Sequence, residues 1–231
     1  MSSLSLNLVA IAIFGFTMSA LLGPLIHLDP IFPAIAAFGL LGLATVDTLG
    51  LNGRGSTLML DWLATISPEH RQRVTHHEAG HFMVAHMLEI PIANYTLTAW
   101  EAFRQGQSGR GGVQFDDRIL AAQLERGTLS AQSLDRYCTV WMAGIAAETL
   151  VYDNAEGGGD DRQQLRTVLS QLSPPIRDTQ QKERWAALQA TTMLATHRVA
   201  YDALVEAMSQ RLPVAECCDI VDKHRSEVKP S

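Results

Sequence analysis

The pattern of apolar and charged positions separates an N-terminal segment from the rest of the chain. Residues 1–26 contain no charged side chain, and a second apolar run follows a short polar segment around Asp29. A helix of about 20 apolar residues spans the hydrocarbon core of a bilayer. We therefore predict a transmembrane helical hairpin over residues 1–51, with its two spans at about 4–26 and 31–51.

Two other interpretations of these apolar runs stay open. A cleaved signal peptide would start with a basic segment and contain a shorter apolar core, and residues 1–26 have neither. A hairpin buried inside a soluble protein is the second alternative. If the hairpin spans a membrane, its orientation follows from the basic residues. The loop between the two apolar runs contains no Lys or Arg, whereas Arg54 follows the second run. The positive-inside tendency then places both ends on the cytoplasmic or stromal side.

The rest of the chain has apolar positions that recur mostly with the period of a helix. We predict a polar, Gly-containing linker at 52–66, a main domain at 67–212 and a polar C-terminal tail at 213–231. Strand-forming residues occupy Ala93–Trp100, and the segment 111–115 can pair with them across a Gly-rich stretch. The sequence thus predicts a mainly α fold with one small β-sheet, whose edge would accept an extended peptide.

An H-E-x-x-H motif at residues 77–81 is the strongest chemical signal in the chain. Ser67 is a favoured N-cap residue, and Pro68 suits the first helical position, where no N–H is needed. We expect one helix from Pro68 to about Glu89, ending before Pro91. The apolar residues after the motif indicate that this helix is buried rather than solvated.

The two histidines of the motif have the spacing of metal ligands. His77 and His81 are four residues apart, so their imidazoles project from one face of the helix and can hold one Zn²⁺ at about 2.0–2.1 Å. Glu78 can take the proton of a metal-bound water, as general base. The alternative is a helix with histidines on its wet face. His76 points about 100° away and is not needed, and His86 lies on a different face.

Charge and cysteine content exclude some other classes of protein. The formal net charge of -6 provides no basic surface for nucleic acid. The three cysteines, two of them adjacent, do not make a disulfide framework and fit a reducing compartment. Their spacing does not indicate a second metal site.

Three segments together resemble the peptidase domain of the FtsH-type membrane zinc metalloproteases. Val74–His81 carries the motif, Met142–Glu148 is similar to the family's Gly-Gly-x-Ala-Ala-Glu helix, and Gly157–Asp161 is similar to its Gly-x-x-Asn-Asp segment. They occur in the family's order, over roughly residues 67–210. The resemblance implies a helical, zincin-like peptidase domain that hydrolyses peptide bonds of unfolded or membrane proteins with metal-activated water.

The third metal ligand must come from outside the motif, because a catalytic zinc site uses three protein ligands and leaves one position for water. The resemblance points to Asp161. Asp160, which replaces the family's Asn, is the competitor, and an Asp after glycines is also a common helix cap. Glu148 continues an apolar helical stripe, where an unpaired carboxylate would be costly. We predict that Glu148 orients a ligand, with direct ligation as the alternative.

One feature of the family is absent from this sequence. The resemblance implies an ATPase module, whose signature is a G-x-x-x-x-G-K-[ST] phosphate-binding loop, and this sequence contains no such loop. ATP-driven unfolding of substrates is therefore in doubt for this chain. Two functions follow: a membrane-anchored zinc endopeptidase that works on polypeptides without its own ATPase, or a catalytically silent, chaperone-like partner in an FtsH-type assembly. Glu78 in the intact motif favours the first. The resemblance leaves a homo-oligomer or association with an FtsH-type ATPase open, and suggests a thylakoid or plasma membrane.

Overall fold

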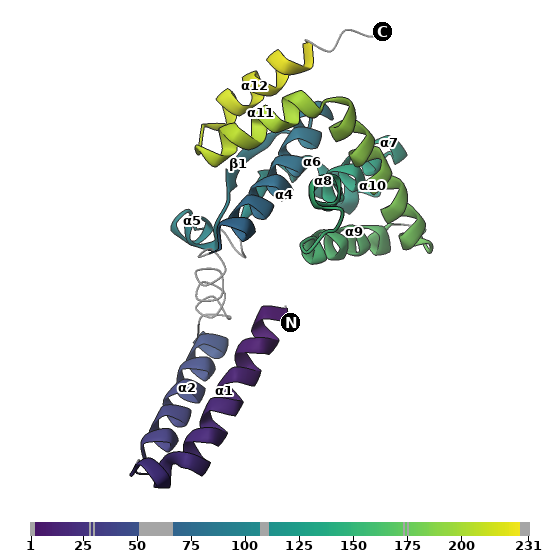
Figure 1. Cartoon of the computed structure of the whole chain (residues 1–231). Coiled ribbons are helices and arrows are strands. Elements are labelled where there is room, and N and C mark those ends of the chain that lie inside the picture. Colours follow the sequence, from purple (N-terminus) through teal and green to yellow (C-terminus); the bar gives the residue numbers. More distant parts are fainter. Residues whose placement is uncertain are drawn as a thin grey trace. The chain divides into compact units, whose positions relative to one another are not determined.

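The computed structural model shows a mainly α-helical chain with one small two-stranded antiparallel sheet, within the residues that it describes (Figure 1). The predicted linker at 52–66 lies outside the described residues. Two compact units divide the chain, the first formed by residues 1–66 and 98–110 and the second by 67–97 and 111–231. The structure describes residues 3–27, 29, 31–50, 67–106, 111–172, 174 and 176–226.

The first unit contains a helical hairpin at the predicted place. Helix α1 (Ser3–Leu22) continues into the short 3-10 helix η1 (Gly23–Ile26), and α2 (Ile31–Gly50) returns beside α1 (Figure 1). The Asp29 carboxylate accepts a hydrogen bond of 3.0 Å from the backbone N–H of Ile31 and so caps the second helix.

Among the described residues, no helix is both long enough and apolar enough to cross a membrane. The predicted hairpin is thus present as two helices. That it spans a membrane stays a prediction. Both helices expose large apolar side chains: Phe14 is 65% and Phe38 is 79% exposed.

Helix α5 (Ala99–Arg104) also belongs to the first unit and corrects the predicted extent of the first strand. The sequence suggested a strand as far as Trp100. Instead, the Thr98 side chain accepts a hydrogen bond of 3.1 Å from the backbone N–H of Glu101 and starts a helix. Trp100 and Phe103 stack on each other with ring centroids 5.8 Å apart.

Helix α4 (Pro68–Met87) is the centre of the second unit. Its N-terminus is capped as predicted, because the Ser67 hydroxyl accepts a hydrogen bond of 3.4 Å from the backbone N–H of His70. The helix lies between α8 (Ala143–Tyr152) and α11 (Arg198–Ser209) (Figure 1). A Cβ at Gly80 would lie only 2.6 Å from the carbonyl oxygen of Ala143, so this glycine allows α4 and α8 to pack closely.

The predicted β-hairpin is confirmed. Strand β1 (Ile92–Thr96) pairs antiparallel with β2 (Gly112–Phe115), and Tyr95 faces Val113 in the register. The Tyr95 hydroxyl donates a hydrogen bond of 2.6 Å to the backbone carbonyl of Leu212, which fixes the sheet to the C-terminal part of the unit.

The predicted C-terminal tail at 213–231 is wrong for most of its length, because a helix begins at Val214 and packs on α11. Cys217 and Val221, one helical turn apart, are fully buried and give this helix an apolar face. The remaining helices of the described part of the unit are α6 (Arg118–Glu125), α7 (Ala131–Trp141), α9 (Gly159–Gln171), α10 (Thr179–Thr196) and α12 (Val214–Ser226).

Candidate metal centre

His77, His81 and Asp161 come together in one cluster, although Asp161 is far from the histidines in the sequence. The Nε2 atoms of the two histidines are 3.1 Å apart. The carboxylate of Asp161 lies 3.1 Å from Nε2 of His77 and 3.4 Å from Nε2 of His81. One potential ligand atom from each residue lies within 4.8 Å of the others, so the three could hold one metal ion.

The other ring nitrogen of each histidine is held by an acceptor. Nδ1 of His81 lies 2.8 Å from the backbone carbonyl of Val140, which can only accept, so this nitrogen carries the proton. Nδ1 of His77 lies 2.7 Å from the carboxylate of Glu148. With Nδ1 donating in both rings, the Nε2 lone pairs of neutral imidazoles point into the cluster, which is the arrangement that metal-binding histidines need.

Glu148 occupies the orienting position predicted for it. Its side chain is 2% exposed and accepts hydrogen bonds from the backbone N–H groups of Glu156 (2.9 Å) and Gly157 (3.1 Å). It also accepts one of 3.2 Å from the guanidinium of Arg73. Both oxygens of Glu148 are occupied by these contacts. Glu148 therefore holds the ring of His77 through Nδ1 and is not one of the three cluster residues.

Asp161, rather than Asp160, enters the cluster because of how α9 begins. Gly158, at the N-cap of this helix, has a φ of 85°, a left-handed conformation that glycine adopts without strain. After this turn, Asp161 in the first helical turn faces the two histidines, whereas Asp160 is exposed. The competing assignment to Asp160 therefore finds no support in the geometry.

Gly144 leaves room for the two imidazoles. A Cβ at this position would lie 2.5 Å from Nε2 of His81 and would collide with Nε2 of His77 as well. The residue is on α8, directly beside the ligand-bearing face of α4. A side chain there would occupy the space that a metal ion held by the two Nε2 atoms would need.

The charges of the cluster are strongly coupled. Burial favours neutral histidine, but hydrogen bonds to Asp161 and Glu148 outweigh it and raise the pKa of His77 to about 10. Burial lowers the pKa of His81 as well, but the charge of Asp161 outweighs burial, so the pKa of His81 is raised. Burial would raise the pKa of Asp161, yet the adjacent histidines hold it far below its usual range. Three carboxylates around two imidazoles, Glu78 among them, thus favour a cation here.

Glu78 is beside the cluster without belonging to it. Its Oε2 accepts a hydrogen bond of 2.9 Å from the backbone N–H of Val113 on β2. A Cβ at Gly112 would lie 3.0 Å from the same oxygen, so strand β2 passes directly next to the carboxylate. The carboxylate of the predicted general base is therefore held against strand β2 of the small sheet.

Two further histidines of α4, His76 and His86, serve other contacts. His76 lies 2.9 Å from the hydroxyl of Tyr201, which donates to the backbone carbonyl of His76 at 3.0 Å. His86 pairs with Asp222 of α12 at 3.0 Å. These positions agree with the prediction, made from the angles around the helix, that neither His76 nor His86 is a metal ligand.

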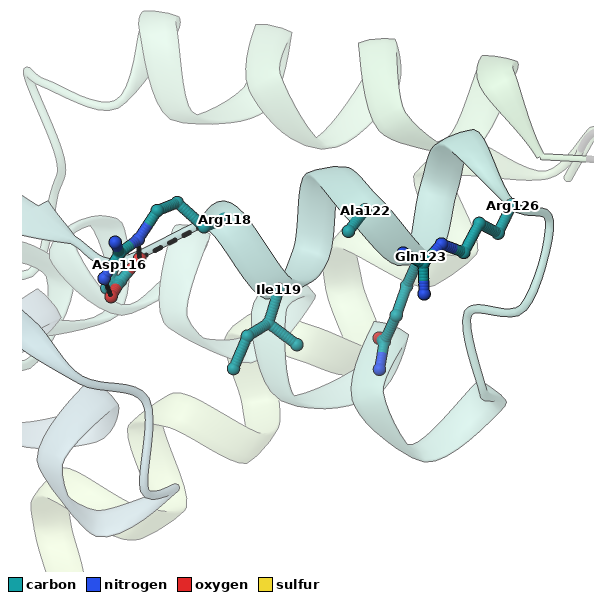
Figure 2. Close-up of a pocket in the computed structure, with 6 residues that line it drawn as sticks. All are labelled: Asp116, Arg118, Ile119, Ala122, Gln123 and Arg126. Atoms are coloured by element: carbon teal, nitrogen blue, oxygen red, sulfur yellow. Dashed lines mark hydrogen bonds and ion pairs between the residues drawn. The ribbon is translucent and has the colours of Figure 1, made fainter.

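A surface hollow of about 550 Å³ lies along α6 and contains none of the three cluster residues. Figure 2 shows Arg118 folded back onto Asp116, with Ile119 and Gln123 along the same helix. Arg118 is largely exposed, at 87%, and so contributes little fixed charge to the hollow. We assign it no chemistry.

Sequence reasoning missed three contributors to the cluster: Arg73, Gly144 and the carbonyl of Val140. Arg73 precedes His77 by four residues, so helical spacing places both on one side of α4 and could have indicated a link. Gly144 was visible only as part of a family-like segment. A backbone carbonyl has no sequence signal.

Comparison of the chain with protein-family models and with curated proteins finds no match. The residues themselves indicate the class of this site: two imidazoles and one carboxylate converge, and Glu78, a fourth residue, brings a second carboxylate beside them.

Proposed function

We propose that the chain is a zinc-dependent endopeptidase of the FtsH type that cleaves unfolded polypeptides without an ATPase of its own. The observation that carries this proposal is the convergence of His77, His81 and Asp161, with Glu78 of the same motif next to them. The resemblance of the three sequence segments to the FtsH peptidase domain is the second support, since two of them contribute to the cluster and the third supplies Glu148.

His77, His81 and Asp161 would hold the metal through Nε2, Nε2 and a carboxylate oxygen. Two imidazoles with one carboxylate also suit iron, so the choice of zinc depends on the motif, in which a glutamate accompanies the histidines. Bound zinc supplies Lewis-acid chemistry: it polarises a peptide carbonyl and makes a bound water more acidic. Metal content of the purified protein, measured by elemental analysis, decides between zinc and iron.

Glu78 would move the proton. Its carboxylate can accept a proton from the attacking water and pass it to the amine that leaves the cleaved bond. The hydrogen bond from Val113 to Oε2 keeps the carboxylate at the border of the cluster and the sheet. An extended peptide that lies along β2 would thus place its backbone beside both Glu78 and the metal ligands. This proposal moves the expected binding edge from Ala93–Trp100 to the neighbouring strand.

Membrane attachment through residues 1–51 is the second element of the proposal. Its support is the uncharged sequence of residues 1–26 and the exposed apolar side chains of α1 and α2. The peptidase would then be on the cytoplasmic or stromal side. Cysteine labelling at positions 29 and 231 in sealed vesicles tests this, and equal accessibility of both positions from outside would contradict it.

The decisive experiment compares the wild-type protein with Glu78→Gln on casein, with and without ATP. We expect slow, zinc-dependent cleavage by the wild type that ATP does not change, because the sequence contains no phosphate-binding loop. Glu78→Gln should lose cleavage and keep its zinc, since Glu78 is outside the metal cluster. Equal activity of both proteins would identify a contaminant. No activity of either, despite bound zinc, favours the silent-partner function.

A further inference from the structure

Arg73 connects the metal cluster with the loop that leads to α9. Its side chain is 11% exposed, and Nη1 donates to Glu148 at 3.2 Å. The same nitrogen donates to the backbone carbonyl (3.3 Å) and the side-chain oxygen (3.0 Å) of Asn154. Nη2 lies 3.5 Å from Glu156, and the guanidinium carbon lies 4.3 Å from the ring centre of Tyr152. One side chain on α4 therefore contacts four residues between 148 and 156.

The carboxylate of Glu148 is buried and is held by several donors at once. A histidine that ligates a metal is neutral, so His77 then offers Glu148 a hydrogen bond without a charge. Two backbone N–H groups, those of Glu156 and Gly157, remain as neutral donors. Among the described contacts of Glu148, Arg73 is then the positive charge that offsets burial of the carboxylate.

The loop that Arg73 holds is packed against the cluster. A Cβ at Gly157 would lie 2.6 Å from Oε1 of Glu148 and 3.2 Å from the ring of His77. This loop continues directly into the turn at Gly158 and then into Asp161. A displacement of the loop would therefore shift both the acceptor of His77 and the start of the helix that carries the third ligand.

We propose that Arg73 is the positioning residue of the metal centre: it fixes Glu148 and the loop 153–157, and through them His77 and Asp161. This inference rests on the proposed metal site. Arginine suits the role because its planar fork can serve several acceptors at once, whereas lysine offers a single point charge.

The test compares Arg73→Met and Arg73→Lys with the wild type and with a matched control. Arg166→Met removes an ion pair of 2.7 Å between α9 and α10, with Glu183, that does not touch the cluster. The full chain is purified in detergent, and zinc dissociation constants are measured by competition with a chromogenic chelator. The visible spectrum of the Co²⁺-loaded protein reports ligand geometry, and thermal unfolding of the metal-free protein reports stability.

For Arg73→Met we expect a zinc dissociation constant about 10-fold higher than that of the wild type. This is the lower end of the range of about 10–100-fold for losing a direct partner of a metal ligand, because Arg73 acts through Glu148. The Co²⁺ spectrum should change as well. The zinc dissociation constant of Arg73→Lys should lie between those of the wild type and Arg73→Met. Arg166→Met should match the wild type in zinc affinity and in the Co²⁺ spectrum. A purely structural role would lower the melting temperature of Arg73→Met and leave zinc affinity and the Co²⁺ spectrum unchanged, which would overturn the proposal.

Two further outcomes separate this inference from the proposed function. If Arg73→Met fails to fold, Arg73→Lys decides alone: wild-type affinity and spectrum in that variant overturn the positioning role, and weakened zinc binding supports it. A wild-type protein that binds no zinc refutes the metal site itself and the inference with it. A zinc-binding wild type with unaffected Arg73 variants refutes only the role of Arg73.

Discussion

Gly144→Ala is the smallest change that tests the geometry of the cluster, because it adds one methyl group. The added Cβ would lie 2.5 Å from Nε2 of His81, where an ordinary contact is at least 3.4 Å. The difference, 3.4 minus 2.5, is about 0.9 Å, and it has to be taken up by the imidazole or by α8. Metal–ligand distances tolerate about 0.2 Å. The substitution therefore disturbs the metal site more than it disturbs the fold.

The two effects differ in size. Overpacking of a core costs about 1–3 kcal/mol, and replacing Gly by Ala inside a helix returns about 1 kcal/mol. We therefore expect the metal-free variant to lose no more than about 2 kcal/mol of stability. A ligand displaced well beyond its tolerance should weaken zinc binding on the order of a hundredfold, equivalent to about 2.8 kcal/mol.

The assay is zinc affinity by chelator competition, together with urea unfolding of the metal-free protein. Gly159→Ala is the matched control, because a Cβ there meets no atom within 4 Å and the residue starts the helix that carries Asp161. The control should bind zinc like the wild type. Wild-type zinc affinity in Gly144→Ala would show that the metal does not sit between His77 and His81, and would refute the reasoning.

Three other substitutions test the assignment of the third ligand and the C-terminal helix. Asp161→Ala should lose zinc, measured as zinc per chain after gel filtration, while Asp160→Ala keeps most of it; loss in Asp160→Ala alone would reverse the assignment. Val221→Asp should destabilise the second unit by about 3 kcal/mol or more in urea unfolding, because it places an unpaired charge at a fully buried position of α12. An unchanged unfolding midpoint would show that α12 is not part of the core.

Local features of the chain were predictable because their causes are local. Ser67 and Pro68 determine where α4 begins, and the four-residue spacing of His77 and His81 determines that both project from one face. The β-hairpin followed from strand-forming residues on either side of a Gly-rich stretch. The orienting role of Glu148 also followed, since a carboxylate on an apolar stripe requires a partner.

Helix α12 shows why a polar segment can be misjudged. Its sequence is mostly polar, and only a narrow face, with Cys217 and Val221, is buried. Whether such a face stabilises a helix depends on a partner surface, here α11, and that surface is formed only when the chain has folded. The sequence therefore predicted a tail where the tertiary structure has a packed helix.

The sequence by itself determined the ligand-bearing helix, its two histidines and the adjacent glutamate, because one helical period relates them. The sequence also pointed to Asp161 and Glu148, but only the tertiary structure decided which groups meet the two histidines. Asp161 meets His77 across 84 residues of chain, and the Val140 carbonyl meets His81 across 59. The left-handed turn at Gly158 and the close packing of α8 on α4 bring these groups together. Such contacts depend on how helices approach each other in space, and no spacing along the sequence encodes that distance.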